Sequence, residues 1–316
     1  MTIVRWNWKL DFETGEIMKK RMTTRRTLTA AAAGTVAGVT AYGLYRGLKY
    51  CNRALVATEY RLRSERVPEA FGGFRIAHIS DLQSEYFGEE QRELLETVRN
   101  GNPDIIAITG DLVDRNHTDF MAALKAVSGL LKIAPVYYVN GNHELQIRQT
   151  RIHPFYEELK LLGVHVMFDR CEKFEKDGSH INIMGVAETS VYAAKEIGWE
   201  LGTGFESAVL LEKLRDICEE KDNAFTIMLT HEPQYLTDYA TTNADVILSG
   251  HAHGGQFRLP NGQGLYAPGQ GVLPKMTSGF HIEGRSAMLV SRGLGNSVFP
   301  FRLNNRPEVG FLTLKR

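Results

Sequence analysis

The stretch Val246-Ile247-Leu248-Ser249-Gly250-His251-Ala252-His253 carries an apolar run directly into two histidines separated by one residue. A short apolar run of this kind is typical of a buried strand, and Gly250 allows the chain to leave that strand in a tight loop. Ligands of open α/β sheets bind at the carboxyl edge of the strands. Both histidines of such a loop can face a metal ion, although on this stretch alone a surface loop with two incidental histidines is the simpler interpretation.

Four other apolar runs along the chain end in polar residues in the same way. These strand-like runs cover residues 74–80, 104–109, 135–139 and 224–230. Helical patterns over residues 89–99 and 118–131 follow the first two runs. Strands that alternate with helices are typical of a parallel α/β sheet, in which the carboxyl ends of the strands meet at one edge. The alternating segment 181–186 is expected to begin a second sheet.

The polar residues at these five strand ends include seven with metal-binding side chains: Asp81, Gln83, Asp111, Asn142, His231, His251 and His253. Carboxylate, amide oxygen and neutral imidazole together suit Mn, Fe or Zn. Each residue alone has an ordinary interpretation, such as a helix cap for an Asp in a turn, but coincidence at five independent strand ends is improbable. With one carboxylate shared, seven ligands suffice for two ions about 3.5–4 Å apart, a pair that stabilises both oxygens of a phosphoryl displacement.

Taken in order, these motifs closely resemble those of the calcineurin-like metallophosphoesterases. The matching residues, within a resemblance that covers about residues 74–316, are Asp81-x-Gln83, Gly110-Asp111, Gly141-Asn142-His143-Glu144, His231 and Gly250-His251-x-His253. The resemblance implies a four-layer α/β/β/α sandwich around a dinuclear metal centre. It also implies the ligands of each metal, with Asp111 bridging: Asp81, Gln83, Asp111 and His253 for the first, and Asp111, Asn142, His231 and His251 for the second.

Two residues have special places in this resemblance. His143 is similar to the family's histidine that is not a ligand and that assists the leaving oxygen, so it is the predicted catalytic residue. The family pattern has a histidine where this chain has Gln83. Because an amide oxygen is a weaker and harder donor than imidazole, we expect a first metal site of lower affinity. Gln83 could ligate through its oxygen, ligate through water, or leave a position open.

The resemblance implies a metal-dependent phosphohydrolase in which a hydroxide bridging the two metals attacks phosphorus in line and His143 protonates the leaving group. The amino-terminal apolar segment and residues 254–260 and 291–296 look like the membrane-associated phosphodiesterase branch, which includes enzymes similar to the UDP-2,3-diacylglucosamine pyrophosphatases. The expected substrate is therefore a lipid-linked or cell-envelope phosphodiester. Alternatives are a phosphomonoesterase that acts on nucleotides or phosphoproteins, and a metal-binding protein without turnover.

The amino-terminal region differs in composition from the rest of the chain. A basic region over residues 1–26 precedes the uncharged residues 27–45, and a linker over residues 46–73 leads to the expected phosphoesterase domain, residues 74–316. As a helix at about 1.5 Å per residue, the uncharged segment would span roughly the hydrocarbon core of a bilayer. Because Arg25-Arg26 stands just before it, a twin-arginine export signal competes with a retained membrane anchor.

These features lead to an expected location and expected partners. We expect a membrane anchor in the amino-terminal segment, with the catalytic domain on the extracytoplasmic side, or else export after cleavage of a signal. Residues 67–316 carry a net charge of −8, which argues against nucleic acid as a partner because phosphates attract clustered Lys and Arg. No obligate protein partner is expected. Three widely spaced cysteines predict no disulfide scaffold.

Overall fold

The computed structural model describes residues 12–192, 205–296 and 299–316, and the chain divides into the units Met1–Lys49 and Tyr50–Arg316. Helix α1 runs over Phe12–Arg53, so the basic region predicted over residues 1–26 lies partly on this helix and partly outside the described residues. Among the described residues, no helix is both long and apolar enough to cross a membrane. The structure therefore does not support a transmembrane helix over residues 27–45.

Part of the segment expected to be a linker, residues 46–73, belongs to the globular unit. β1 (Val56–Arg63) pairs in parallel with β14 (Glu308–Lys315) along its whole length. Residues of β1 alternate between half-buried and exposed, as in an edge strand with one face on the core and the other in solvent. The folded unit thus begins before residue 74, and its first strand is held by the last strand of the chain.

The first sheet contains six strands in the order β1-β14-β2-β3-β4-β5. Four of them run parallel to one another: β2 (Arg75–Ile79), β3 (Ile105–Thr109), β4 (Val136–Val139) and β5 (His165–Val166). β14 is antiparallel to β2. The residues of β3 and β4 are buried throughout, which explains their continuous apolar runs, because a strand covered on both faces has no solvent side.

The second sheet has the order β12-β13-β9-β8-β7-β6. Its strands are β6 (Arg170–Lys176), β7 (Ser179–Gly185), β8 (Thr226–Leu229), β9 (Val246–Ser249), β12 (Gly279–Glu283) and β13 (Ser286–Val290). The alternating segment predicted to begin a second sheet forms β7. A separate two-stranded ribbon consists of β10 (Tyr266–Ala267) and β11 (Gly271–Val272).

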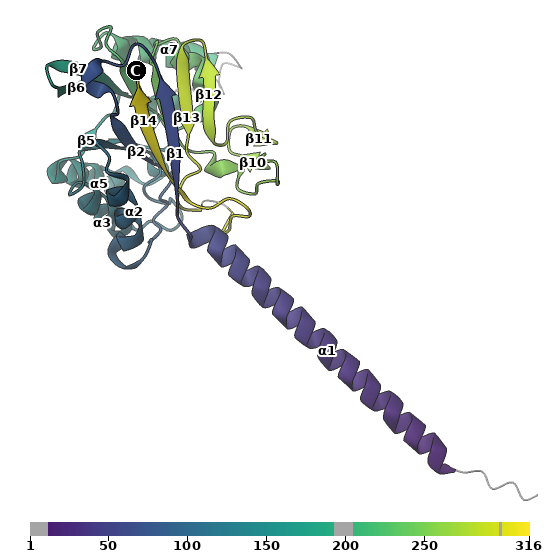
Figure 1. The fold of residues 1–316 in the computed structure, drawn as a ribbon. Coiled ribbons are helices and arrows are strands. Elements are labelled where there is room, and N and C mark those ends of the chain that lie inside the picture. The colour runs from purple at the N-terminus through teal and green to yellow at the C-terminus, as the bar shows by residue number, and fades with distance from the viewer. Residues whose placement is uncertain (1–11, 193–204, 297–298) are drawn as a thin grey trace, which may run out of the picture. The chain divides into compact units, whose positions relative to one another are not determined.

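Helices cover the outer face of each sheet (Figure 1). The first sheet packs against α2 (Arg92–Gly101), α3 (Phe120–Leu130) and α5 (Gln149–Leu162), and the second against α7 (Phe205–Cys218) and α8 (Leu236–Ala240). A third hydrophobic cluster lies between the two sheets. The layers are therefore α/β/β/α, as the sequence resemblance implied. Short α4 (Asn142–Leu145) begins directly after β4 in the chain.

Candidate metal centre

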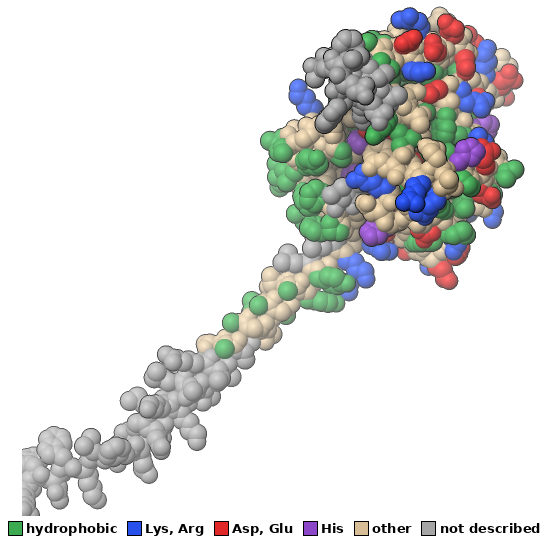
Figure 2. Space-filling model, turned by 180° about the vertical axis from the view of Figure 1, so that it is seen from behind, with side chains coloured by type: hydrophobic (Ala, Val, Ile, Leu, Met, Phe, Trp, Pro, Cys, Tyr) green, Lys and Arg blue, Asp and Glu red, His purple; other side chains and the backbone are tan. Residues whose placement is uncertain are grey.

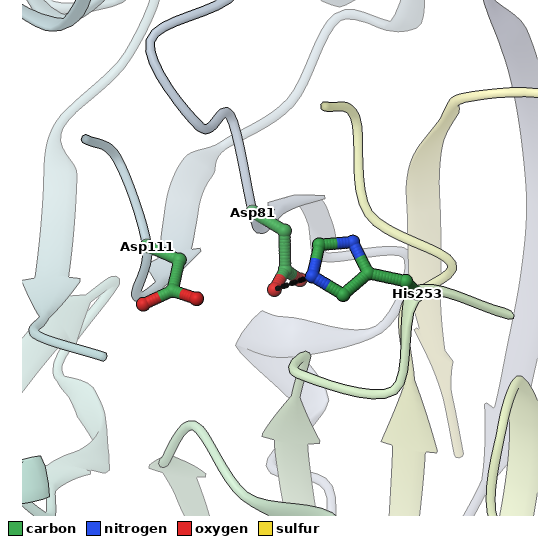
Figure 3. Close-up of side chains that lie close together, drawn as sticks. All are labelled: Asp81, Asp111 and His253. Atoms are coloured by element: carbon green, nitrogen blue, oxygen red, sulfur yellow. Dashed lines mark ion pairs between the residues drawn. The ribbon is translucent and has the colours of Figure 1, made fainter. Parts of the chain in front are cut away.

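Asp81, Asp111 and His253 come together in loops that follow β2, β3 and β9. One potential ligand atom from each lies within 4.8 Å of the other two, and all three side chains are buried. Nε2 of His253 lies 3.4 Å from Oδ1 of Asp81. Figure 3 shows these two side chains pointing toward one another, with Asp111 beside them. Gln83 joins this group, because its Nε2 donates to Oδ2 of Asp111 over 2.7 Å.

Asn142, His231 and His251 form a second group that also includes Asp111. Nε2 of His231 lies 3.1 Å from Oδ1 of Asn142, 3.2 Å from Nδ1 of His251 and 3.4 Å from Oδ2 of Asp111. Nδ1 of His231 donates to the carbonyl of Thr109 over 2.7 Å, so the ring is fixed with Nε2 facing the other three side chains. Asp111 contacts both groups, and the seven predicted ligands lie in one connected cluster.

Five of these seven residues have a left-handed backbone. The φ angles are 54° at Asp81, 52° at Gln83, 53° at Asp111, 65° at His251 and 45° at His253. Residues other than glycine rarely adopt this region, and each one costs of order 1–3 kcal/mol. In return, the backbone N–H of His251 points at the carboxylate of Asp81, 3.1 Å from Oδ2. Strain collected at one polar cluster is typical of a functional site.

Two glycines allow the loops of the cluster to approach closely. A Cβ on Gly141 would lie 2.3 Å from Oδ1 of Asp111, and a Cβ on Gly250 would lie 1.8 Å from Oγ of Ser80. Neither position has room for a side chain. Packing therefore requires a glycine at both positions, each of which directly precedes a predicted metal ligand. The backbone angles of the two glycines are not the reason.

Burial and charge act in opposite directions on the side chains of the cluster. Burial alone would raise the pKa of Asp111, but the imidazoles of His231 and His143 hold that pKa well below its usual range. Burial lowers the pKa of His251 to about 4 and also lowers the pKa of His253. At neutral pH Asp111 is thus charged and the imidazoles of His251 and His253 are neutral, as metal binding requires. Burial alone would lower the pKa of His231, but Asp111 raises it above its ordinary value, so a metal ion would have to displace a proton from His231.

His143 lies at the edge of the cluster. Its Nδ1 is 3.3 Å from Oδ2 of Asp114, and its Nε2 is 4.0 Å from Oδ2 of Asp111. Burial alone would lower the pKa of His143, but the two carboxylates raise it above its ordinary value. A histidine that retains a proton near neutrality is suited to protonate a leaving group. The catalytic role of His143 stays a prediction that this position supports.

Two buried residues with ionisable side chains, Glu144 and Arg302, support the cluster and were not predicted as site residues. Glu144 accepts hydrogen bonds from the backbone N–H groups of Asp111 and Gly141 over 3.0 and 2.9 Å. It therefore fixes the loop that carries Asp111, and its position inside the Gly-Asn-His-Glu motif was the signal that could have identified it. Arg302 is completely buried, with Nη2 3.4 Å from Nδ1 of His253. No local sequence pattern marks Arg302.

A cavity of about 570 Å³ opens beside the cluster. Gln83 and Asp114 contribute to its wall, and the rest of the lining is mostly polar: Ser84, Glu85, Arg115, Asn116, His117, Asn296 and Pro300. Ligand sites are typically concave and carry a few polar groups that orient the ligand. The cavity has room for a polar group attached to a phosphate held at the cluster.

Several known proteins are similar to this chain over most of its length. A profile of the family described as calcineurin-like phosphoesterase matches residues 74–255. The uncharacterized metallophosphoesterase YkuE of Bacillus subtilis (strain 168) is 28% identical over 94% of this chain and 99% of its own length. Phosphodiesterase YaeI of Escherichia coli (strain K12) is 25% identical over 93% of this chain and 100% of its own length. A transmembrane protein with metallophosphoesterase domain from Bos taurus is 24% identical over 98% of this chain and 66% of its own length.

Proposed function

Because this chain belongs to the calcineurin-like phosphoesterase family and is therefore a hydrolase of phosphoric ester bonds, we propose that it is a metal-dependent phosphodiesterase with a centre of two divalent ions. The position of Asp111 carries this proposal. Its Oδ2 lies 2.7 Å from Nε2 of Gln83 and 3.4 Å from Nε2 of His231, so one carboxylate contacts both ligand groups. A shared carboxylate is what a pair of closely spaced metal ions requires.

The side chains of the cluster fit divalent ions. Their carboxylate, amide and imidazole donors suit Mn, Fe or Zn, and Oε1 of Gln83 is buried with no hydrogen-bond partner in the described part of the chain. When bound, two such ions would neutralise the phosphoryl oxygens and supply a hydroxide nucleophile at neutral pH. The side chains that would hold them are Asp81, Gln83, Asp111 and His253 for one ion, and Asp111, Asn142, His231 and His251 for the other.

The protein groups around these ligands have separate tasks. His143 donates a proton to the leaving oxygen, and Asp114, with Oδ2 3.3 Å from Nδ1 of His143, orients that imidazole. Glu144 holds the loop of Asp111 through its backbone hydrogen bonds. Because the cluster is buried, its charges act in a medium of low dielectric constant, where they stabilise a charged transition state more strongly than in water.

We assign the second ester group of the substrate to the cavity beside Gln83 and Asp114. The polar lining, with Arg115 and Asn116, suits an alcohol that bears hydroxyl or phosphate groups, such as the polar part of a lipid-linked or cell-envelope phosphodiester. The relative YaeI is named a phosphodiesterase, which favours a diester over the alternative phosphomonoester. Membership of the narrower branch that includes the UDP-2,3-diacylglucosamine pyrophosphatase-like enzymes stays a prediction.

Association with a membrane is part of the proposal. Residues 18–66 carry eleven Lys and Arg against two Glu, and clustered cations are attracted to anionic lipid. One relative is named a transmembrane protein. Substrate in the plane of the membrane would then be close to the domain. The proposal includes neither nucleic acid nor an obligate protein partner.

Hydrolysis by the purified protein tests the proposal. With Mn²⁺, we expect hydrolysis of bis(p-nitrophenyl) phosphate, slower hydrolysis of p-nitrophenyl phosphate, and no activity after chelation. Asp111→Asn should abolish the metal-dependent reaction, whereas Asp216→Asn, at an exposed position of α7, should leave it unchanged. Full activity of Asp111→Asn would refute the shared metal centre. Hydrolysis of the monoester alone would establish the alternative phosphomonoesterase, and metal binding without hydrolysis of either ester would establish a binding protein.

A further inference from the structure

Hydrophobic side chains are exposed on loops near the cluster. We define the apolar rim as Tyr266, Val272, Leu273, Phe299, Phe301 and Leu303, whose exposed fractions run from 39% at Phe301 to 77% at Val272. Tyr266 pairs with Val272 across the β10–β11 ribbon, and the rings of Tyr266 and Phe299 lie 6.4 Å apart. The rim is therefore one surface, and Figure 2 shows hydrophobic side chains gathered on one side of the globular unit.

The rim is connected to the loop that carries His253. Nε2 of Gln256 donates to the carbonyls of Phe299 and Phe301 over 3.1 and 2.7 Å. Pro300, between these two phenylalanines, contributes to the lining of the cavity beside Gln83. A partner that covers the rim therefore lies next to the proposed substrate cavity.

The segments that carry the rim contain cations and no acidic residue. Residues 256–278 and 291–307 include five Arg and Lys but no Asp or Glu, whereas residues 67–316 as a whole have a net charge of −8. Arg302 is buried, and Arg258, Arg292 and Arg306 are half-buried, so the exposed cation of these two segments is Lys275. The segments that carry the rim thus contribute no acid that an anionic surface would repel, whereas two acids, Glu85 and Asp114, line the cavity beside Pro300.

This combination of groups matches a lipid surface. Single exposed hydrophobic side chains are ordinary, but a contiguous apolar surface beside a site marks a contact region. Aromatic and aliphatic side chains with neighbouring cations are the groups that enter the interface of an anionic bilayer. Leu273 has a left-handed backbone with φ 53°, held by a hydrogen bond from its N–H to the carbonyl of Leu265 over 2.9 Å, and this turn leaves its side chain 57% exposed.

We propose that the apolar rim docks on the surface of an anionic lipid bilayer and presents the cavity to phosphodiesters in the plane of that membrane. The proposed contact involves residues other than those of the amino-terminal segment. Presentation of the cavity to phosphodiesters rests on the proposed function, whereas docking of the rim does not, because docking is measured without substrate. A failure of the proposed function would therefore be distinguishable from a failure of the rim to dock.

Tryptophan substitutions in the full-length protein place a reporter on the rim. Val272→Trp puts an indole on β11, and Leu161→Trp puts one on α5, at a side chain that is 81% exposed and on the opposite side of the globular unit (Figure 1). The signal of the three native tryptophans is subtracted with the unsubstituted protein. Vesicles of phosphatidylcholine and phosphatidylglycerol with brominated acyl chains should quench the added emission of Val272→Trp by about half, because only the rim enters the interface. The emission of Leu161→Trp should not change.

Two further measurements test the proposal: quenching by neutral instead of anionic vesicles, and self-association of the protein without lipid. Vesicles of phosphatidylcholine alone should quench Val272→Trp clearly less than the anionic vesicles do, since the exposed Lys275 beside the rim contributes to binding. Equal quenching of the two variants, or no quenching of Val272→Trp, would overturn the proposal. So would a concentration-dependent dimer that Leu273→Asn abolishes without any lipid effect, because the rim would then contact a second copy of the chain.

Discussion

Gln83 donates its side-chain amide to Oδ2 of Asp111 over 2.7 Å, while its own oxygen is buried without a hydrogen-bond partner among the described residues. The same carboxylate oxygen also faces His231. Turning the amide would direct the oxygen of Gln83 at Asp111, and two acceptors can face each other only with a cation between them. Direct ligation by Gln83 in that orientation would break its hydrogen bond to Asp111, and the cost of breaking it would oppose binding at the proposed first site.

Gln83→His should strengthen this site. Imidazole is a better ligand for Mn or Zn than an amide oxygen, and the substitution removes the hydrogen bond that competes for Asp111. We expect the weaker of two Mn²⁺ dissociation constants to fall by about tenfold, as measured by titration calorimetry. Gln149→His, at an exposed position of α5, is the matched control and should leave both constants unchanged. Two equally tight sites in the unsubstituted protein would contradict the explanation.

Gly250→Ala should damage both stability and the metal centre. The added Cβ would lie 1.8 Å from Oγ of Ser80 and 2.6 Å from Oδ2 of Asp81, so the loop must move. We expect a loss of about 3 kcal/mol or more in the free energy of unfolding by urea, together with weaker metal binding. Gly310→Ala is the control, because its Cβ would meet ordinary contacts of 3.5 Å or more. Equal losses of stability from both substitutions would show that the loss comes from placing a methyl group at any buried glycine, and not from the close approach of the loops at Gly250.

The strand ends of the site could be predicted because their signals are local. β3 and β9 are buried throughout, so each appears in the sequence as an unbroken apolar run with a polar residue after it. A glycine stands directly before each of these polar residues, Gly110 before Asp111 and Gly250 before His251, and it indicates that the strand ends in a tight loop there. The left-handed φ angles of Asp111 and His251 could not be predicted, because that conformation depends on the packing of the loops against one another.

The parts that sequence reasoning missed depend on contacts between distant residues. β1 was expected to be a linker because its half-exposed residues form no apolar run, and its pairing with β14 connects opposite ends of the chain. Arg302 is buried because loop carbonyls surround it, including that of Gly295 at 2.5 Å from Nη2. Arg292 pairs its Nε with Oε2 of Glu308 at 2.5 Å, a contact that no local sequence pattern marks.

Glu308→Gln should reduce stability at neutral pH. The side chain of Glu308 is 1% exposed and that of Arg292 is 19% exposed, so the substitution leaves a largely buried guanidinium without its acid. We expect a loss of about 3 kcal/mol in the free energy of unfolding. Glu283→Gln, at an exposed position of β12, should change this free energy very little.

The contribution of Glu308 should also depend on pH. Burial alone would raise the pKa of Glu308, but Arg292 lowers it below its ordinary value. A carboxyl group with a lowered pKa in the folded state stabilises the protein above its unfolded pKa of about 4.3, and this contribution is lost as the pH falls through the folded pKa. The difference in unfolding free energy between the unsubstituted protein and Glu308→Gln should therefore be largest at neutral pH and shrink in acid. A difference that is constant with pH would contradict the ion pair.

Asp114 should act on hydrolysis only through His143. Its Oδ2 lies 3.3 Å from Nδ1 of His143, so it can orient the imidazole without touching the phosphate. We expect Asp114→Asn to lower kcat by about tenfold or more with little change in KM, and His143→Ala to lower it by about 10²–10⁴-fold.

A double-mutant cycle isolates this dependence. Once His143 is gone there is no imidazole to orient, so the double variant should be no slower than His143→Ala alone. Asp216→Asn, exposed on α7, should change neither kcat nor KM. Multiplicative losses in the double variant would instead assign Asp114 a direct contact with substrate in the cavity that it lines, and His143 would then have to be oriented by other groups.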